Sequence, residues 1–215
     1  MDMNKLALIP LWMIPFIFSL SFHEFSHAWT ANLLGDGTAK FMGRVSMNPK
    51  AHIDPIGTIL FPIIGFITGF PLIGWAKPVI INERNFKHPY QDAMYVAAAG
   101  PISNLFLALC FTGAAHLINQ GHSDAMRVHG FDEPLLMMAI FGIQLNVFLA
   151  FFNLLPMPPL DGGRVLRGLF PFLAPKLAIL ERYGFMILMI MMYTGLFRIL
   201  LAPASRLINV LMSHI

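Results

Sequence analysis

Residues 18–34 read Phe-Ser-Leu-Ser-Phe-His-Glu-Phe-Ser-His-Ala-Trp-Thr-Ala-Asn-Leu-Leu, which places a His-Glu-x-x-His sequence inside a segment apolar enough for a lipid bilayer. On a helix, His23 and His27 lie one turn apart on the same face, so both imidazoles can bind one metal ion. Glu24 lies beside them, where its carboxylate can take a proton from a zinc-bound water. Ionisable residues at membrane depth are costly and usually functional. The stretch therefore indicates a zinc hydrolase centre within a membrane helix.

The composition of the whole chain is that of a membrane protein. Its 215 residues are 57% hydrophobic and only 12% charged, whereas a soluble domain carries about 25% charged residues. We therefore expect a single α-helical polytopic membrane domain over residues 1–215. The net charge of +3 is small and no basic run is present, so nucleic acid is not an expected partner.

Apolar runs predict about four to six transmembrane helices. The first is the zinc-motif helix at 6–34, in which about 25 Å of helix precedes the histidines. Because the hydrocarbon core is about 30 Å thick, the histidines should lie below one membrane surface. Further helices are expected at 93–118, 135–155 and 183–201, with a C-terminal helix at 203–215.

The region 35–92 contains turn-rich and apolar segments on the expected cytoplasmic side. We expect a small membrane-associated β element around 40–82. Residues 56–72 are apolar but interrupted by glycine and proline, and their length is marginal for a crossing. This segment either crosses the membrane fully or enters it and returns to the same side. Re-entry is favoured, because a full crossing would place basic loops on opposite sides of the membrane.

Charges in the connecting segments predict the orientation. Three Lys or Arg residues lie in 35–55, three in 73–92 and four in 156–182. The segment 119–134 has one basic residue against three acidic ones. Since basic loops stay in the cytoplasm, the first three segments should face the cytoplasm and the last one the outside. The histidines then lie toward the cytoplasmic side.

Asp161 is the expected third zinc ligand, because a catalytic zinc needs about three protein ligands. The span 135–155 ends on the cytoplasmic side, and a proline-rich segment then leads to Asp161. These prolines break the helix, while Gly162 and Gly163 allow a tight turn. Taken alone, Asp161 could equally be the N-cap of a short helix at 163–170.

Two motifs far apart in the chain resemble those of a known family. Together, His23-Glu24-Phe25-Ser26-His27 and Asn153-x-x-Pro156-x-Pro158-x-Leu160-Asp161-Gly162 resemble the site-2 protease family of intramembrane zinc metalloproteases. Further stretches look like motifs of its compact bacterial branch: 43–49, 52–57, 74–78 and 99–104. The resemblance covers nearly the whole chain. In this branch we expect neither a PDZ nor a CBS domain.

The resemblance implies a cofactor and a role for each site residue. One Zn²⁺ per chain is expected on His23, His27 and Asp161, with Glu24 as the general base and Asn153 holding the substrate or the oxyanion. Implied partners are the lipid bilayer and single-span membrane proteins, which are cleaved within or near the membrane. The implied location is the bacterial inner membrane. The region 40–82 is expected to present the substrate.

Two more residues are secondary candidates. Asn104, in an apolar span, is expected either to hydrogen-bond near the site or to bond another helix. His52, near Asp54, either approaches the site or serves its own loop.

Two alternative functions use the same ligands. A membrane zinc carrier or transporter should line a path across the bilayer with more carboxylates or histidines, and the remaining spans contain almost none. A catalytically silent protein that holds membrane helices should lack Glu24 or a ligand, yet all are present. The protease is therefore the favoured interpretation.

Overall fold

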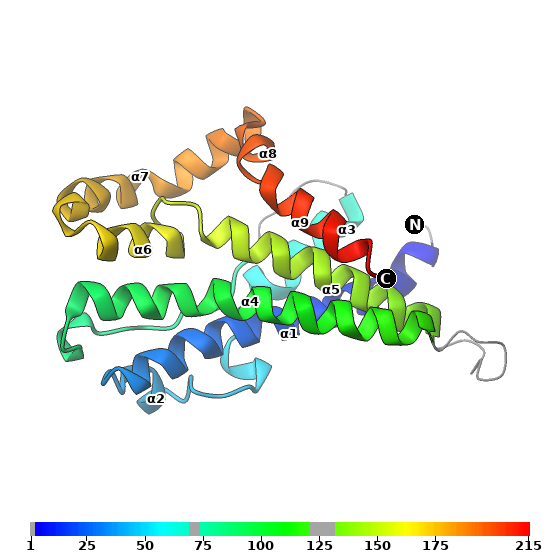
Figure 1. Cartoon of the computed structure of the whole chain (residues 1–215), viewed down its shortest axis with the longest axis horizontal. Helices are drawn as coiled ribbons and strands as arrows, with labels where there is room; N and C mark the ends of the chain where they lie inside the picture. Colours follow the sequence, from blue (N-terminus) through cyan, green and yellow to red (C-terminus); the bar gives the residue numbers. More distant parts are fainter. Residues whose placement is uncertain (1–2, 69–73, 121–131) are drawn as a thin grey trace.

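Three long helices form the centre of the molecule in a computed structural model, which describes residues 3–68, 74–120 and 132–215. They are α1 (Met3–Leu33), α4 (Pro89–Gln120) and α5 (Asp132–Asn153) (Figure 1). In the described part of the chain, these three are long and apolar enough to cross a membrane. A helix satisfies its own backbone groups, which is what a bilayer demands. The expectation of an α-helical membrane protein is thus confirmed.

Small side chains let α4 and α5 pack closely. Ala108 and Ala115 of α4 meet Ala139, Ile143 and Val147 of α5 in one buried cluster. Large apolar side chains on the outward faces stay exposed, such as Ile102, Phe106 and Leu109 of α4. Small residues inside and large apolar residues outside are typical of helices that pack within lipid.

The chain after α5 differs from the expected span at 183–201. It forms α6 (Asp161–Leu169), α7 (Ala174–Tyr193), α8 (Leu196–Leu200) and α9 (Ala202–Met212). The expected helix therefore begins earlier and ends at Tyr193. Gly195 separates α7 from α8 with a φ of 74°, a conformation that favours glycine and ends helices. Charged residues in the first half of α7 keep it out of the set of long apolar helices. The described residues therefore contain three helices that could cross a membrane, fewer than the four to six expected.

The β element expected around 40–82 is not formed by the described residues of that region. They contain α2 (Thr38–Phe41), a 3-10 turn at Pro49–Ala51, a π-helix at Pro55–Leu60 and α3 (Phe61–Thr68). Residues 74–82 are extended but have no partner strand. Their N–H groups bond to loop carbonyls and to side chains instead, for example Lys77 N–H to the His52 carbonyl at 2.8 Å. The β element expected around 40–82 is therefore not found among the described residues.

The extended segment forms hydrogen bonds with the π-helix at Pro55–Leu60. The Trp75 N–H donates to the Gly57 carbonyl at 3.1 Å, and the Thr58 hydroxyl donates to the Trp75 carbonyl at 2.7 Å. A side chain at Gly57 would overlap the Trp75 indole ring. Residues 69–72 of the expected re-entrant segment lie outside the described residues, as does most of the acid-leaning segment 119–134.

Several helices meet at the end of the bundle that contains the histidines. Both α6 and α7 lie at the end where α1 finishes and α4 begins (Figure 1). At the opposite end, α9 packs on α5 through Ala204 and Leu211. The site described next lies at the first of these two ends.

Candidate metal centre

The side chains of His23, His27 and Asp161 meet at one point between α1 and the start of α6. The two Nε2 atoms are 3.0 Å apart, and Asp161 Oδ2 lies 3.2 and 3.3 Å from them. Zinc held tetrahedrally with bonds of about 2.0–2.1 Å requires ligand atoms about 3.3–3.4 Å apart. Two imidazoles and a carboxylate at this spacing therefore fit a catalytic zinc site with one open position.

The outer nitrogen of each imidazole has its own hydrogen-bond partner. His27 Nδ1 is 2.7 Å from the Val96 carbonyl, and His23 Nδ1 is 2.5 Å from Asn104 Oδ1. Metal-binding histidines commonly donate their second N–H to such an acceptor, which sets the tautomer and the ring orientation. Both rings thus present Nε2 to Asp161.

Gly100 allows α4 to approach the two histidines. A Cβ atom at this position would lie 2.5 Å from His23 Cε1 and from His27 Nε2. Any side chain would therefore push α4 away and remove the Val96 carbonyl and the Asn104 amide from the rings. The sequence pattern had marked residues 99–104 only by their resemblance to a motif, and no sequence signal identifies a backbone carbonyl such as that of Val96.

A compact turn after α5 brings Asp161 to the histidines. Gly162 packs against the backbone of Leu154 and Leu155, and Gly163 packs against Pro158, so neither position has room for a side chain. Burial alone would raise the pKa of the Asp161 carboxyl. The charges and hydrogen bonds of the neighbouring histidines outweigh burial and hold that pKa well below its usual range. Asp161 is the first residue of α6, whose N-cap is Leu160, and its side chain faces the two histidines.

Glu24 and Asn153 line the same cavity of about 180 Å³ as the three clustered side chains. Glu24 Oε2 accepts a hydrogen bond from the Val79 N–H at 3.1 Å. The Asn153 amide donates to the Leu149 carbonyl of its own helix at 3.0 Å. Both predicted catalytic residues therefore lie beside the cluster, and the extended segment 74–82 forms one wall of the cavity.

His52 is not brought to the cluster. It is buried, its Nε2 atom lies 2.8 Å from the Ser46 carbonyl, and it does not line the cavity. Its contact to Ser46 connects two parts of the segment between α2 and the π-helix. Of the two secondary candidates, only Asn104 contacts a residue of the cluster.

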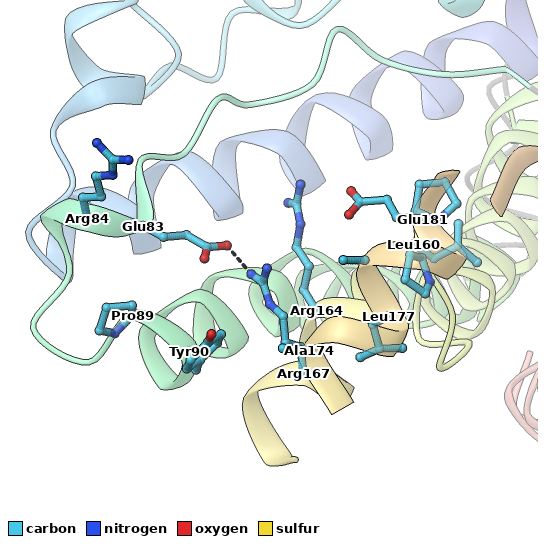
Figure 2. A pocket seen from close by; sticks show the side chains of 14 residues that line it. Glu83, Arg84, Pro89, Tyr90, Leu160, Arg164, Arg167, Ala174, Leu177 and Glu181 are labelled. Carbon is cyan, nitrogen blue, oxygen red and sulfur yellow. Dashed lines mark hydrogen bonds and ion pairs between the residues drawn. The ribbon is translucent and has the colours of Figure 1, made fainter. Parts of the chain in front are cut away.

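A larger cavity of about 600 Å³ adjoins the first and shares Pro159 and Arg164 with it (Figure 2). Glu83 and Arg167 form an ion pair on its wall, and the Arg167 guanidinium lies over the Tyr90 ring at 5.7 Å from its centre. Such charged side chains keep a cavity hydrated. A cavity with charged side chains on its wall therefore lies directly beside the clustered side chains.

Comparisons with known proteins identify the family of this chain. Residues 113–194, which include Asn153 and Asp161, match peptidase family M50. "Putative zinc metalloprotease YwhC" of Bacillus subtilis (strain 168) is 40% identical over 199 residues, which cover 92% of this chain and 87% of that protein. Rip2 of Mycolicibacterium smegmatis, with the same description, is 28% identical over 83% of this chain and 64% of its own length. No solved structure matches. The chain therefore belongs to peptidase family M50, the site-2 protease family of zinc metalloproteases.

Proposed function

We propose that this chain is an intramembrane zinc endopeptidase that hydrolyses peptide bonds of transmembrane helical substrates. The observation that carries the proposal is the meeting of His23, His27 and Asp161 at zinc-ligand spacing beside Glu24. These three ligands would hold one Zn²⁺ per chain. When bound, zinc lowers the pKa of a coordinated water to about 7 and thereby supplies the nucleophile.

Glu24 is the general base. It takes the proton of the attacking water and later delivers it to the leaving amine. Because the Val79 N–H bonds to Oε2, the Glu24 carboxylate keeps its other oxygen for this proton transfer. The Asn153 amide stabilises the oxyanion of the tetrahedral intermediate, for which its side chain must turn from the Leu149 carbonyl.

The extended segment 74–82 receives the substrate backbone. A transmembrane helix hides its carbonyls in hydrogen bonds, so a substrate must unwind before it is cleaved. The N–H groups of Trp75, Lys77 and Val79 are bonded on one side of the segment. On the other side, the N–H of Ile80 and the carbonyl of Pro78 have no partner among the described residues. An unwound substrate can pair with this free edge by β-addition.

The site faces the cytoplasmic side of a bacterial inner membrane in this proposal. The basic segments at 35–55, 73–92 and 156–182 support that orientation. The return of Trp75 to Gly57 supports a re-entrant segment at 56–72 rather than a crossing. Water reaches the centre through the charged cavity of Figure 2, which shares Arg164 with it.

Cleavage of a single-span model substrate by purified protein in detergent tests the proposal. Wild type, Glu24→Gln and the exposed control Glu133→Gln are compared with zinc supplied throughout. Wild type and the control should cleave and lose activity with a chelator, while Glu24→Gln should bind zinc and not cleave. Equal cleavage by Glu24→Gln would overturn the general-base assignment. Zinc flux through liposomes, with no cleavage by any variant, would favour the carrier instead.

A further inference from the structure

A chain of buried polar side chains extends from His23 across all three long helices. Asn104 of α4, Asn146 of α5 and Ser19 of α1 are each 0% exposed. Asn104 Nδ2 donates to Asn146 Oδ1 at 2.8 Å, and Asn146 Nδ2 donates to Ser19 Oγ at 2.7 Å. The same Asn146 Nδ2 donates to the Gly142 carbonyl at 2.8 Å. Polar groups so deep in apolar helices are costly unless each has its partner.

The Gly142 carbonyl sets the direction of every bond in this chain. A carbonyl oxygen only accepts, so the Asn146 NH₂ group must face it and Asn146 Oδ1 must face Asn104. Asn104 must then turn its NH₂ group to Asn146 and its oxygen to His23. An amide oxygen only accepts as well, so His23 Nδ1 has to carry the proton. Reversing either amide would place two acceptors, or two donors, against each other.

A single hydrogen bond fixes the same tautomer in His27. Its Nδ1 faces the Val96 backbone carbonyl directly, so that acceptor alone fixes the Nδ1–H tautomer. Among the described residues, no backbone carbonyl bonds to the His23 ring. The two asparagines connect that ring to the carbonyl of Gly142 instead.

We infer that Asn104 and Asn146 are positioning residues that hold His23 in its Nδ1–H tautomer, with Nε2 free for the metal. This role rests on the metal site of the proposed function. Neither residue touches the reacting atoms. Ser19 is not needed for the tautomer, because a hydroxyl both donates and accepts and therefore sets no direction.

Close packing of α4 on α5 makes the asparagine pair possible. A Cβ atom at Gly142 would lie 2.7 Å from the Phe111 ring of α4. Glycine at this position thus allows the two helices to approach, and its carbonyl provides the terminal acceptor one turn before Asn146.

Zinc affinity measured by competition with a chromophoric chelator tests the inference. All variants are made in the Glu24→Gln background, so that the readout does not depend on proteolysis. Asn104→Leu and Asn146→Leu should weaken zinc binding by about 10- to 100-fold, the range for loss of a residue that supports a metal ligand. Ser19→Ala should leave zinc affinity unchanged, as should the matched control Ser103→Ala, whose hydroxyl bonds only its own helix at Gly100.

The conservative variant Asn104→Asp separates positioning from packing. It keeps an acceptor for His23 Nδ1–H but sets a carboxylate oxygen against Asn146 Oδ1. Its zinc affinity should therefore lie between that of the parent and that of Asn104→Leu. ¹⁵N NMR of histidine-labelled apoprotein should show Nδ1–H at His23 in the parent and a mixture of tautomers in Asn146→Leu.

Several results would overturn the inference. Equal losses in Ser19→Ala and Asn146→Leu would do so, as would a lowered melting temperature of the apoprotein with unchanged zinc affinity. If Asn146→Leu does not fold, the comparison of Asn104→Asp with Asn104→Leu decides alone, and equal affinities there count against the inference. Failure of the parent itself to bind zinc would instead count against the metal site.

Discussion

The carboxylate of Glu24 accepts a hydrogen bond from the backbone N–H of Val79, at 3.1 Å and across 55 residues of sequence. This bond attaches the extended segment 74–82 to the metal-centre helix. In the proposed mechanism, the same segment receives the substrate and the same carboxylate moves the proton. The position of the base and the position of the substrate are therefore set by one stretch of backbone.

Val79→Pro should lower kcat, because proline has no N–H to orient Glu24. The loss should stay below the factor of about 10²–10⁴ that removal of a general base costs. Ile80→Pro removes an N–H that has no partner among the described residues, so it should raise KM for the substrate instead. Steady-state cleavage kinetics distinguish the two. The same change in kcat and KM for both variants would contradict the separate roles.

Gly100→Ala should weaken zinc binding and cleavage together, since its Cβ would lie 2.5 Å from the imidazole atoms of His23 and His27. Gly113→Ala is the matched control on the same helix, because no atom lies within 4 Å of a Cβ there. That control should keep zinc affinity and stabilise α4 by about 1 kcal/mol. Chelator competition and thermal melting measure both effects. Normal zinc binding by Gly100→Ala would show that α4 does not approach the histidines this closely.

Asp36 should make stability depend on pH on the acid side. Its carboxylate is fully buried and accepts hydrogen bonds from Thr38, from the Asn82 N–H and from the Asn85 amide. Burial opposes ionisation, but these bonds outweigh it and hold the pKa of Asp36 below its ordinary value. The stabilisation is therefore complete above the unfolded pKa of about 3.9 and is lost as pH falls through the lower folded pKa.

Melting temperatures measured from neutral to acid pH check this expectation. Asp36→Asn should melt lower than wild type at neutral pH and show a weaker loss on acidification. Glu181→Gln, an exposed change on α7, should follow the wild-type profile. Parallel profiles for wild type and Asp36→Asn would contradict the role of this carboxylate.

Zinc should stabilise the folded chain through its three ligands. A metal that binds only the native state at 100 times its Kd adds about 2.7 kcal/mol to the free energy of unfolding. Zinc should therefore raise the melting temperature of wild type, and chelation should reverse the rise. Asp161→Asn and His27→Ala should lose most of this response, while His52→Ala should keep it. An undiminished response in Asp161→Asn would remove that residue from the ligand set.

Part of the site could be predicted from residue type and spacing. His23 and His27 are four apart on a helix, and Asp161 follows a proline-rich break after a span, so their meeting required only helix periodicity and a consistent orientation of the spans. The backbone partners of His27 and Glu24 could not be predicted in this way. Val96 acts through a carbonyl and Val79 through an N–H, which every residue carries, so neither leaves a mark in the sequence.

The sequence by itself determined that this chain is a helical membrane protein whose first helix carries two histidines one turn apart, because apolar run length and residue spacing are local properties. Only the tertiary structure decided which backbone and side chains surround the ligands. It also decided that residues 74–82 stay extended without a partner strand, and that α7 ends at Tyr193. These outcomes depend on contacts between segments far apart in the chain, such as Gly100 against His27 and Trp75 against Gly57, whose close approach no local pattern encodes.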